Sequence, residues 1–339
     1  MRLKSYFQVL TATLIASSLT FAAPGIAQTI ELKASSFTSP QNPMTKGMVK
    51  WAELLKQKSN GRINITVFPA SQMGPPPRQF DLARTGVADL TIVLHGLTPG
   101  RFPITELAHV PGVVKAKSNF GASEALTSLI PVFAAEHDGV KIINMFATKT
   151  LVLSRSEYKT ASDLAGKRIR AAGSVQSDVL KAMGAAPALV QPTEMNEAFS
   201  RGMLDGISTA YSGIESWKLE EIGKFVVEGE MGLVTFATVM NQKAYDSLPA
   251  DLKKIIDENS GHESNKIFAR MMNDDENRFR EALIKQGIKI QSLTDDEPLK
   301  KASGVILEDA IKKASAKGVD GKKVIQQIDA ASAQFGGQM

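Results

Sequence analysis

Few residues in this chain have the type and spacing that catalysis requires. The four histidines, His95, His109, His137 and His262, are too widely spaced to form a metal-binding pair on one helix, and no cysteine is present to bind zinc. The patterns G-x-S-x-G, G-x-G-x-x-G and G-x-x-x-x-G-K-S/T are absent, so the usual signals of an esterase, a dinucleotide site and a P-loop are missing. We expect no catalytic residue, no metal and no cofactor. A binding protein is favoured over an enzyme with scattered catalytic residues.

The acidic clusters and the overall charge indicate neither a calcium site nor a nucleic-acid partner. The clusters 274–276 and 295–297 lack the alternating oxygen ligands and the sixth-position glycine of a calcium loop, so we interpret both as surface charge. The formal net charge is +5, basic residues are interleaved with acids, and aromatic residues make up only 6%. A nucleic-acid footprint would need a one-signed stripe with aromatic platforms.

The N-terminus has the organisation of a secretory signal peptide. Arg2 and Lys4 precede a short apolar run, and Gly25-Ile26-Ala27 forms a small-x-small cleavage site. We therefore expect residues 1–27 to be removed near Gln28 and the mature chain to be periplasmic. No segment reaches the roughly 20 apolar residues that a membrane-spanning helix needs. Without cysteines, stability must come from a hydrophobic core.

The hydrophobic pattern then alternates between the strand period and the helix period. The first half predicts strands at 30–35, 63–67 and 90–94, with helices at 44–55 and 80–84 between them. The second half predicts strands at 150–153, 167–171, 188–190 and 233–240, and helices at 174–183, 193–203, 244–259 and 263–286. This β-α-β-α-β order is typical of a parallel sheet covered by helices.

Two such α/β units joined by more than one crossing predict a bilobed molecule with a cleft. Open α/β sheets bind ligands beyond the carboxyl ends of their strands, so the cleft is the expected site. The charged segment 263–286 has no Pro or Gly and is long enough to cross between lobes. We expect lobe I at 28–149 plus 237–280, lobe II at 150–236 plus 281–330, and a tail at 331–339.

Four segments in order carry a resemblance to a known family. They are GRINITVFPASQMG at 61–74, DLAGKRIR at 163–170, MGA at 183–185 followed by GMLDG at 202–206, and VMNQKAYDSLP at 239–249. The chain resembles the solute-binding receptors of tripartite ATP-independent periplasmic (TRAP) transporters over nearly all of its mature length. The resemblance implies a periplasmic-binding-protein fold with two α/β domains, a long lobe-spanning helix and a ligand cleft between the domains.

The resemblance assigns one residue directly. Arg170 stands where the family's Gly-x-Lys-x-Arg segment places the arginine that pairs with the ligand carboxylate. A planar guanidinium offers two donors that match a carboxylate, which Lys does not. Arg168 is two residues away and points to the same face of an extended strand, but its family position is not the ligand arginine. We interpret Arg168 as structural.

Departures from the family pattern narrow the range of acids that this chain is expected to bind. Some members have a second arginine where this chain has Thr150, and an asparagine where it has Ile207 to Tyr211. We therefore expect a monocarboxylate, or an acid with a less polar body, rather than a sugar acid or diacid. Trp217 is expected in the core and Arg101 near the cleft mouth. Candidate wall residues, at strand ends or just after them, are Phe37, His95, Thr193, Thr209 and Tyr211.

The implied function is capture of a small organic acid in the periplasm. The receptor would close around the acid and deliver it to the small and large membrane subunits of a TRAP transporter. Two alternatives share the compartment and the cleft: a receptor for an ATP-driven importer or sensor kinase, and a periplasmic enzyme on a similar scaffold. A structural or chaperone role is a third, and it predicts no saturable small ligand.

Overall fold

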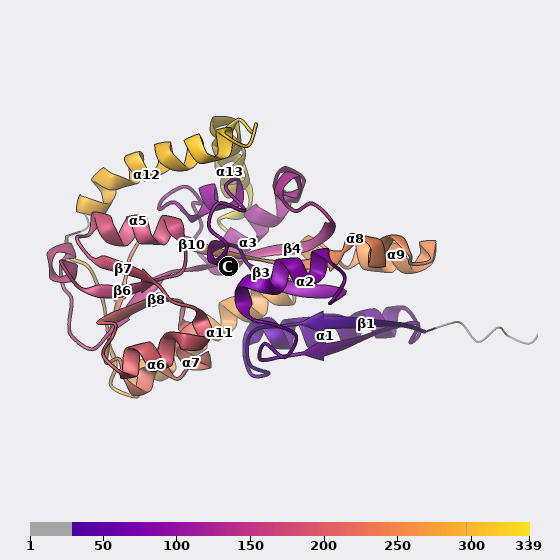
Figure 1. Ribbon diagram of the computed structural model, residues 1–339, viewed down its shortest axis with the longest axis horizontal. Helices are drawn as coiled ribbons and strands as arrows, with labels where there is room; N and C mark the ends of the chain where they lie inside the picture. The colour runs from indigo at the N-terminus through magenta and orange to yellow at the C-terminus, as the bar shows by residue number, and fades with distance from the viewer. Residues whose placement is uncertain (1–28, 296) are drawn as a thin grey trace, which may run out of the picture.

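The computed structural model describes residues 29–295 and 297–339, and the predicted signal peptide lies outside this range. Two separate β-sheets, each covered by helices, follow one another along the long axis of the molecule (Figure 1). This confirms the bilobed α/β architecture that the sequence predicts. None of the helices in the described residues combines the length and the apolar character needed to cross a membrane.

The first sheet has five strands in the order β2-β1-β3-β10-β4. Strand β1 is parallel to β2 and β3, whereas β10 is antiparallel to β3 and β4. Strand β3 is buried along its whole length, as its continuous apolar run LTIVL predicts for an inner strand of a covered sheet. The bounds are β1 (Ile30–Ser35), β2 (Ile63–Phe68), β3 (Leu90–Leu94), β4 (Val140–Lys149) and β10 (Leu233–Asn241).

The second sheet has six strands in the order β11-β9-β5-β8-β6-β7. Strand β6 is parallel to β7 and β8, and β5 is antiparallel to β8 and β9. The carboxyl ends of β6 and β8 therefore lie at the same edge of this sheet. The bounds are β5 (Leu151–Ser154), β6 (Arg168–Ala171), β7 (Ala186–Leu189), β8 (Gly206–Thr209), β9 (Phe225–Glu228) and β11 (Lys289–Ser292).

Helix α1 (Pro43–Lys58) shows how local sequence sets an element. The Asn42 side chain accepts a hydrogen bond from the Met44 N–H, and Pro43 occupies the first turn, where its missing N–H costs nothing. Trp51 is buried on the apolar face. The other α-helices are α2 (Gln79–Arg84), α3 (Asn119–Ser128), α4 (Ile130–Phe133), α5 (Ser174–Ala182), α6 (Met195–Ser200), α7 (Tyr211–Ser216), α8 (Gln242–Asp246), α9 (Ala250–Glu258), α10 (His262–Asn265), α11 (Phe268–Lys285), α12 (Glu297–Ser315) and α13 (Gly321–Phe335).

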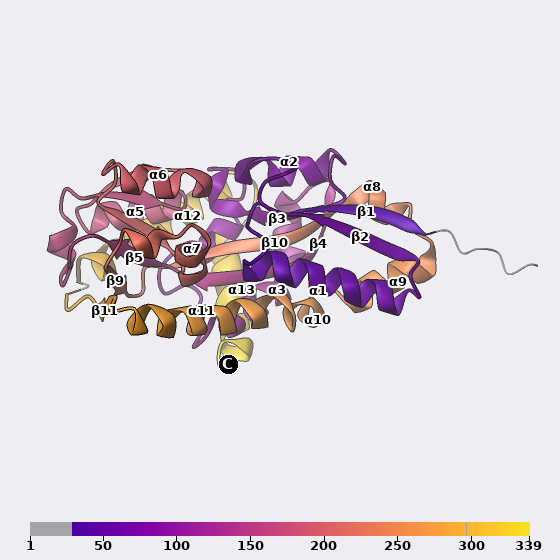
Figure 2. The same ribbon diagram turned by 90° about the horizontal axis from the view of Figure 1, so that it is seen from below.

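Three segments cross between the sheets. Only Thr150 separates β4 from β5, residues 229–232 join β9 to β10, and α11 leads to β11. The Thr150 hydroxyl donates to the Gly232 carbonyl at 3.1 Å, so the first two crossings are hydrogen-bonded to each other. Helix α11 runs past both lobes along the lower edge of Figure 2, and it contacts α1 of the first lobe and α7 of the second. The two lobes are therefore connected by a narrow strand pair and one helix.

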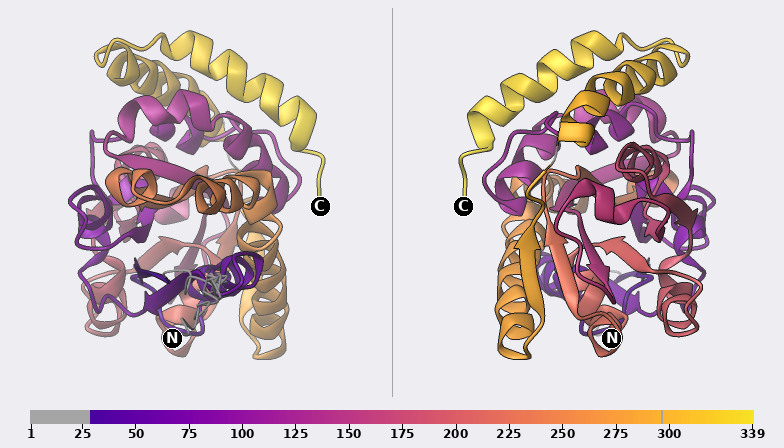
Figure 3. Two further views of the ribbon diagram at one scale, coloured as in Figure 1. Left: turned by 90° about the vertical axis from the view of Figure 1, so that its right-hand side faces the viewer. Right: turned by 90° about the vertical axis from the view of Figure 1, so that its left-hand side faces the viewer.

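Helices α12 and α13 lie together across one face of the molecule (Figure 3). Helix α12 packs on α5 and α13 packs on α3, so this pair contacts both lobes. One hydrophobic cluster, including Leu126, Val179 and Ile328, is shared by the lobes and these helices. Two further clusters are centred on Trp51 and Phe199, one in each lobe.

Several predicted elements differ from the structure. The single helix expected at 244–259 is two helices, α8 and α9, because Pro249 interrupts the helical hydrogen bonding. The long helix begins at Phe268 rather than 263, and residues 193–203 form a helix only from Met195 to Ser200. Residues 331–335 belong to α13 instead of a tail.

Candidate ligand-binding cleft

The candidate site is a narrow cavity where the two lobes meet. The first lobe contributes the turn after β1, the start of α1 and the end of β3. The second lobe contributes the ends of β6 and β8 together with α7, and strands β4 and β10 complete the wall beside the crossings. One cation is present among otherwise apolar, hydroxyl and amide side chains: Phe37, Thr38, Asn42, Met44, Leu94, Thr148, Arg170, Ala172, Pro192, Met195, Thr209, Ala210, Ser212, Gly213, Trp217, Val234 and Phe236.

Arg170 lines this cavity and is only 2% exposed. Its Nε–H donates to the Val190 carbonyl at 3.0 Å, and its Nη1–H donates to the Ser208 carbonyl at 2.8 Å. Burial lowers the pKa of Arg170 to about 10, and no acid of the described residues pairs with it. The side chain is therefore a protonated, buried cation oriented by two carbonyls. Such a group needs an anion to offset its loss of hydration.

Thr209 and Phe37 lie on the same cavity as Arg170. Thr209 ends β8 and Phe37 follows β1, so both occupy the strand-end positions that the sequence predicts. Helix α7 approaches Thr209 closely because residue 213 is glycine: a Cβ there would lie 2.2 Å from Thr209 Oγ1. Three of the six predicted site residues are thus brought together.

Two contacts join the lobes beside the cavity. The Asn42 Nδ2–H donates to Ser216 Oγ at 2.7 Å, which links the start of α1 to the end of α7. The backbone at Gly96 packs against the loop after β6, where a Cβ on Gly96 would lie 2.3 Å from the Ala172 carbonyl oxygen. Because the lobes touch around a narrow space, a ligand held there contacts both of them.

Tyr211 and Thr193 lie outside the lining of this cavity. The Tyr211 hydroxyl donates to Glu228 at 2.7 Å, and Tyr211 lines a second, larger cavity. Arg280 also lines that cavity. Its Nε–H donates to Glu228 at 2.7 Å, so the Arg280 guanidinium already has a carboxylate partner. Thr193 is exposed, and its neighbour Pro192 lines the cleft instead.

His95 is also outside the cavity lining, within a buried chain of three histidines. The His137 Nδ1–H donates to the Phe133 carbonyl at 2.8 Å, so a neutral His137 accepts from His95 Nε2 at 3.0 Å. His95 Nδ1 then accepts from the Thr235 hydroxyl at 2.9 Å, and His109 Nε2–H donates to the same hydroxyl at 2.6 Å. Burial lowers the pKa of both His109 and His137 to about 4.

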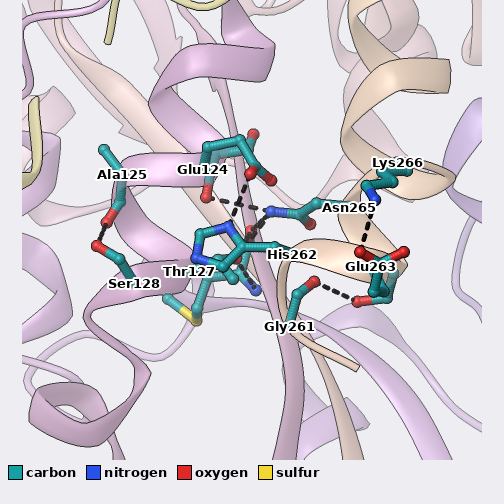
Figure 4. Close-up of polar contacts among 12 residues, drawn as sticks. Glu124, Ala125, Thr127, Ser128, Gly261, His262, Glu263, Asn265 and Lys266 are labelled. Atoms are coloured by element: carbon teal, nitrogen blue, oxygen red, sulfur yellow. Dashed lines mark hydrogen bonds and ion pairs between the residues drawn. The ribbon is translucent and has the colours of Figure 1, made fainter. Parts of the chain in front are cut away.

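The fourth histidine, His262, joins α3 to α10 (Figure 4). Its Nδ1 lies 2.7 Å from Glu124 Oε2, and the neighbouring Asn265 Nδ2–H donates to Thr127 Oγ1 at 2.8 Å. His262 also stacks on Phe335 of α13 with ring centroids 5.0 Å apart. These contacts hold α10, which leads into α11, against α3 and α13.

Glu276 and Arg168, two residues expected to lie outside the site, have different environments. Glu276, expected as surface charge, is 5% exposed and accepts from the backbone N–H groups of Tyr211 and Ser212 at 2.8 Å each. Burial raises the pKa of Glu276 to about 7. Arg168, expected to be structural, donates through its backbone N–H to Asp205 at 2.8 Å and forms an exposed ion pair with that carboxylate.

Several cavity residues were not predicted from the sequence. Trp217, expected in the core, is half-buried and lines the cleft. Thr148, Val234 and Phe236 come from the paired strands β4 and β10. The apolar run at 140–149 was a signal for β4 that could have been used, but pairing of β4 with β10 across the sequence was not evident locally.

The fold is that of a two-lobed binding protein with a buried arginine in the cleft. The model of the family described as bacterial extracellular solute-binding protein, family 7, matches residues 34–313, and the chain belongs to this family. The C4-dicarboxylate-binding periplasmic protein DctP of Rhodobacter capsulatus is 25% identical over 244 residues, which cover 70% of this chain and 73% of the relative. The predicted family is confirmed.

Solved structures support the same class of protein. A TRAP solute-binding protein of Rhodoferax ferrireducens, in complex with copurified benzoate, has a TM-score of 0.84 and 26% identity over 91% of this chain and 98% of its own. A marine metagenome TRAP solute-binding protein specific for aromatic acid ligands, with 3-hydroxybenzoate, also has a TM-score of 0.84, with 29% identity over 91% and 99%. This protein is a TRAP-type solute-binding protein.

Proposed function

We propose that this protein captures an aromatic monocarboxylate in the periplasm, after removal of residues 1–27, and delivers it to the small and large membrane subunits of a TRAP transporter. The observation that carries the proposal is Arg170, a buried cation without a carboxylate partner among the described residues, in a cavity otherwise walled by apolar and uncharged polar groups. It acts as a receptor and not as an enzyme. Family membership favours a TRAP partner over an ATP-driven importer or a sensor kinase.

The cavity composition supports one carboxylate and an aromatic body. Arg170 is the only Lys or Arg among its described lining residues, so a second carboxylate would be desolvated without a counter-charge. Phe37, Phe236 and Trp217 offer ring surfaces, and Thr209 offers a hydroxyl to a carboxylate oxygen. The benzoate and 3-hydroxybenzoate of the two similar structures fit this chemistry.

Binding would proceed by closure of the lobes. A ligand that contacts both lobes stabilises the arrangement in which they touch, and it shifts the population toward that form. The Asn42–Ser216 hydrogen bond and the close approach at Gly96 belong to this closed arrangement. The membrane subunits would recognise the closed form.

The first test is a ligand screen by thermal unfolding of mature protein that has been unfolded and refolded to remove copurified acid. The panel contains benzoate, hydroxybenzoates, aliphatic monocarboxylates, dicarboxylates and sugar acids. An acid present at a hundred times its Kd stabilises the protein by about 2.7 kcal/mol. Stabilisation by aromatic monocarboxylates is expected, and stabilisation by dicarboxylates alone would contradict the proposal.

Replacement of Arg170 tests the site. We expect Arg170→Ala to weaken binding of the best aromatic acid by at least about a hundredfold, because a buried carboxylate without its partner costs about 3–5 kcal/mol. Isothermal titration calorimetry measures the affinity. Arg168→Ala is the matched control, since Arg168 lies on the same strand with an exposed side chain, and it should leave affinity unchanged. A loss of affinity below threefold in Arg170→Ala would show that Arg170 does not bind the ligand.

A further inference from the structure

One hydroxyl in the cleft has no partner. Thr148 lies near the end of β4, is fully buried at 0% exposure and lines the same cavity as Arg170. Among the cavity-lining side chains of the described residues, Thr148 Oγ1 is the only buried polar side-chain atom without a hydrogen bond. A buried hydroxyl left unpaired is unfavourable, because it has lost water without gaining another partner.

The neighbours of Thr148 on its sheet face are apolar. Val234 stands directly opposite it on β10, and Phe236 lies two residues further along that strand. Phe236 in turn stacks on Phe146, with ring centroids 5.1 Å apart and planes 13° from parallel. Packing alone would be served equally by valine, which has the same shape as threonine without the hydroxyl. The hydroxyl therefore has no structural use on this face.

Thr38 and Asn42, the other polar side chains that the first lobe contributes to the cavity, are already hydrogen-bonded. The Thr38 hydroxyl is hydrogen-bonded to Thr45 Oγ1 at 2.8 Å. The Asn42 side chain caps α1 through its oxygen and bonds Ser216 through its nitrogen. Arg170 and Thr209 belong to the other lobe and are assigned to the carboxylate, and the Ser212 side chain is hydrogen-bonded to Glu276. Thr148 is thus the available buried partner for a second, uncharged polar group on the ligand.

We propose that Thr148 Oγ1 binds a neutral hydroxyl of the ligand and makes the receptor selective for hydroxylated aromatic acids over benzoate. This inference rests on the proposed function. A threonine hydroxyl can donate and accept, so it pairs with a ligand hydroxyl in either sense. A site built around such a bond rejects the analogue without the hydroxyl, because the buried protein group then stays unpaired.

The test is the affinity of wild type, Thr148→Val and Thr148→Ser for benzoate and for 2-, 3- and 4-hydroxybenzoate, measured by calorimetry. We expect wild type to prefer at least one hydroxybenzoate over benzoate by about tenfold, the value of one net hydrogen bond. Thr148→Val should abolish this preference, because it removes both the bond to the ligand hydroxyl and the unpaired hydroxyl that benzoate leaves. Thr148→Ser should retain the preference.

Thr238→Val is the matched control. Thr238 on β10 also has a buried hydroxyl without a partner, but it does not line the cavity. Its replacement should leave the preference intact. Equal losses for benzoate and hydroxybenzoate in Thr148→Val, or an unchanged preference, would overturn the role of Thr148. If wild type binds benzoate but prefers no hydroxybenzoate, this inference fails alone. If it binds no aromatic acid, the proposed function fails with it.

Discussion

At the scale of the residue, two arginines on one strand have opposite environments. Arg168 is exposed and paired with Asp205, whereas Arg170, two positions later, is buried with only carbonyl partners. Arg170 lies on β6, between β7 and β8, and its hydrogen bonds go to the carbonyls of Val190, just after β7, and of Ser208 in β8. The same type of side chain is thus a surface ion-pair partner in one place and the proposed anion-binding group in the other.

Arg170→Lys separates charge from geometry. Lysine keeps the positive charge but has a single ammonium, which cannot bond the carbonyls of Val190 and Ser208 and still present two donors to a carboxylate. We expect an affinity for the best aromatic acid at least about tenfold below wild type and above that of Arg170→Ala. Calorimetry of the three proteins checks this order. A lysine variant equal to wild type would show that charge alone is sufficient.

At the scale of the element, short helices and loops place the cavity wall. The two N–H groups at the start of α7 are held by Glu276, which projects from α11. Helix α7 carries Ser212 and Gly213 of the wall, so the long helix that passes under both lobes also fixes part of the site. On the other side of the cavity, the loop after β6 meets the turn after β3 at Gly96.

Gly96→Ala should impair closure. The added Cβ would meet the Ala172 carbonyl oxygen at 2.3 Å, and because this neighbour is backbone, the loops must separate. We expect affinity for the best aromatic acid to fall by at least about tenfold, in line with the 1–3 kcal/mol typical of overpacking. Calorimetry measures the affinity, and small-angle scattering should show a less compact ligand-bound form.

Gly304→Ala is the control for this replacement. Gly304 lies in α12, and a Cβ there meets nothing within 4 Å. This variant should bind as wild type does. Wild-type affinity in Gly96→Ala would mean that the lobes do not need this contact in order to close.

At the scale of the whole molecule, the narrow connection between lobes is compatible with hinge motion, while buried ionisable groups make stability depend on pH. Burial lowers the pKa of His109 and His137 to about 4, so their contribution is present above pH 6.5 and is lost as pH falls toward 4. Glu136 and Glu276 act in the opposite sense. Burial raises the pKa of each to about 7, so their contribution increases as pH falls from 7 toward 4.5.

His109→Gln removes the contribution of one histidine to this pH dependence of stability. Glutamine can still donate to the Thr235 hydroxyl, as His109 Nε2–H does, but it does not titrate. We expect the stability advantage of wild type over the variant to shrink as pH falls from 6.5 to 4, by up to about 1.4 kcal/mol per pH unit. Urea unfolding of both proteins at several pH values measures it. A difference that is constant with pH would contradict this assignment.

The sequence by itself determined the alternation of strands and helices, the two-lobed class, the family and the position of Arg170. These features are local: periodicity fixes an element, and a strand-end motif fixes an arginine relative to its own strand. The same local information placed Phe37 and Thr209 at strand ends, and both line the cavity. It also allowed Glu276 to be mistaken for surface charge, because burial of an acid depends on the helix that packs against it.

Only the tertiary structure decided which strand-end residues share a cavity. Thr209 and Tyr211 are two residues apart, yet the chain enters α7 between them and Tyr211 lines a different cavity. Thr148 and Val234 meet because β4 pairs with β10 across more than eighty residues of intervening sequence. Side-chain spacing along one element cannot encode such contacts, since they depend on strand pairing and on the closing of one lobe against the other.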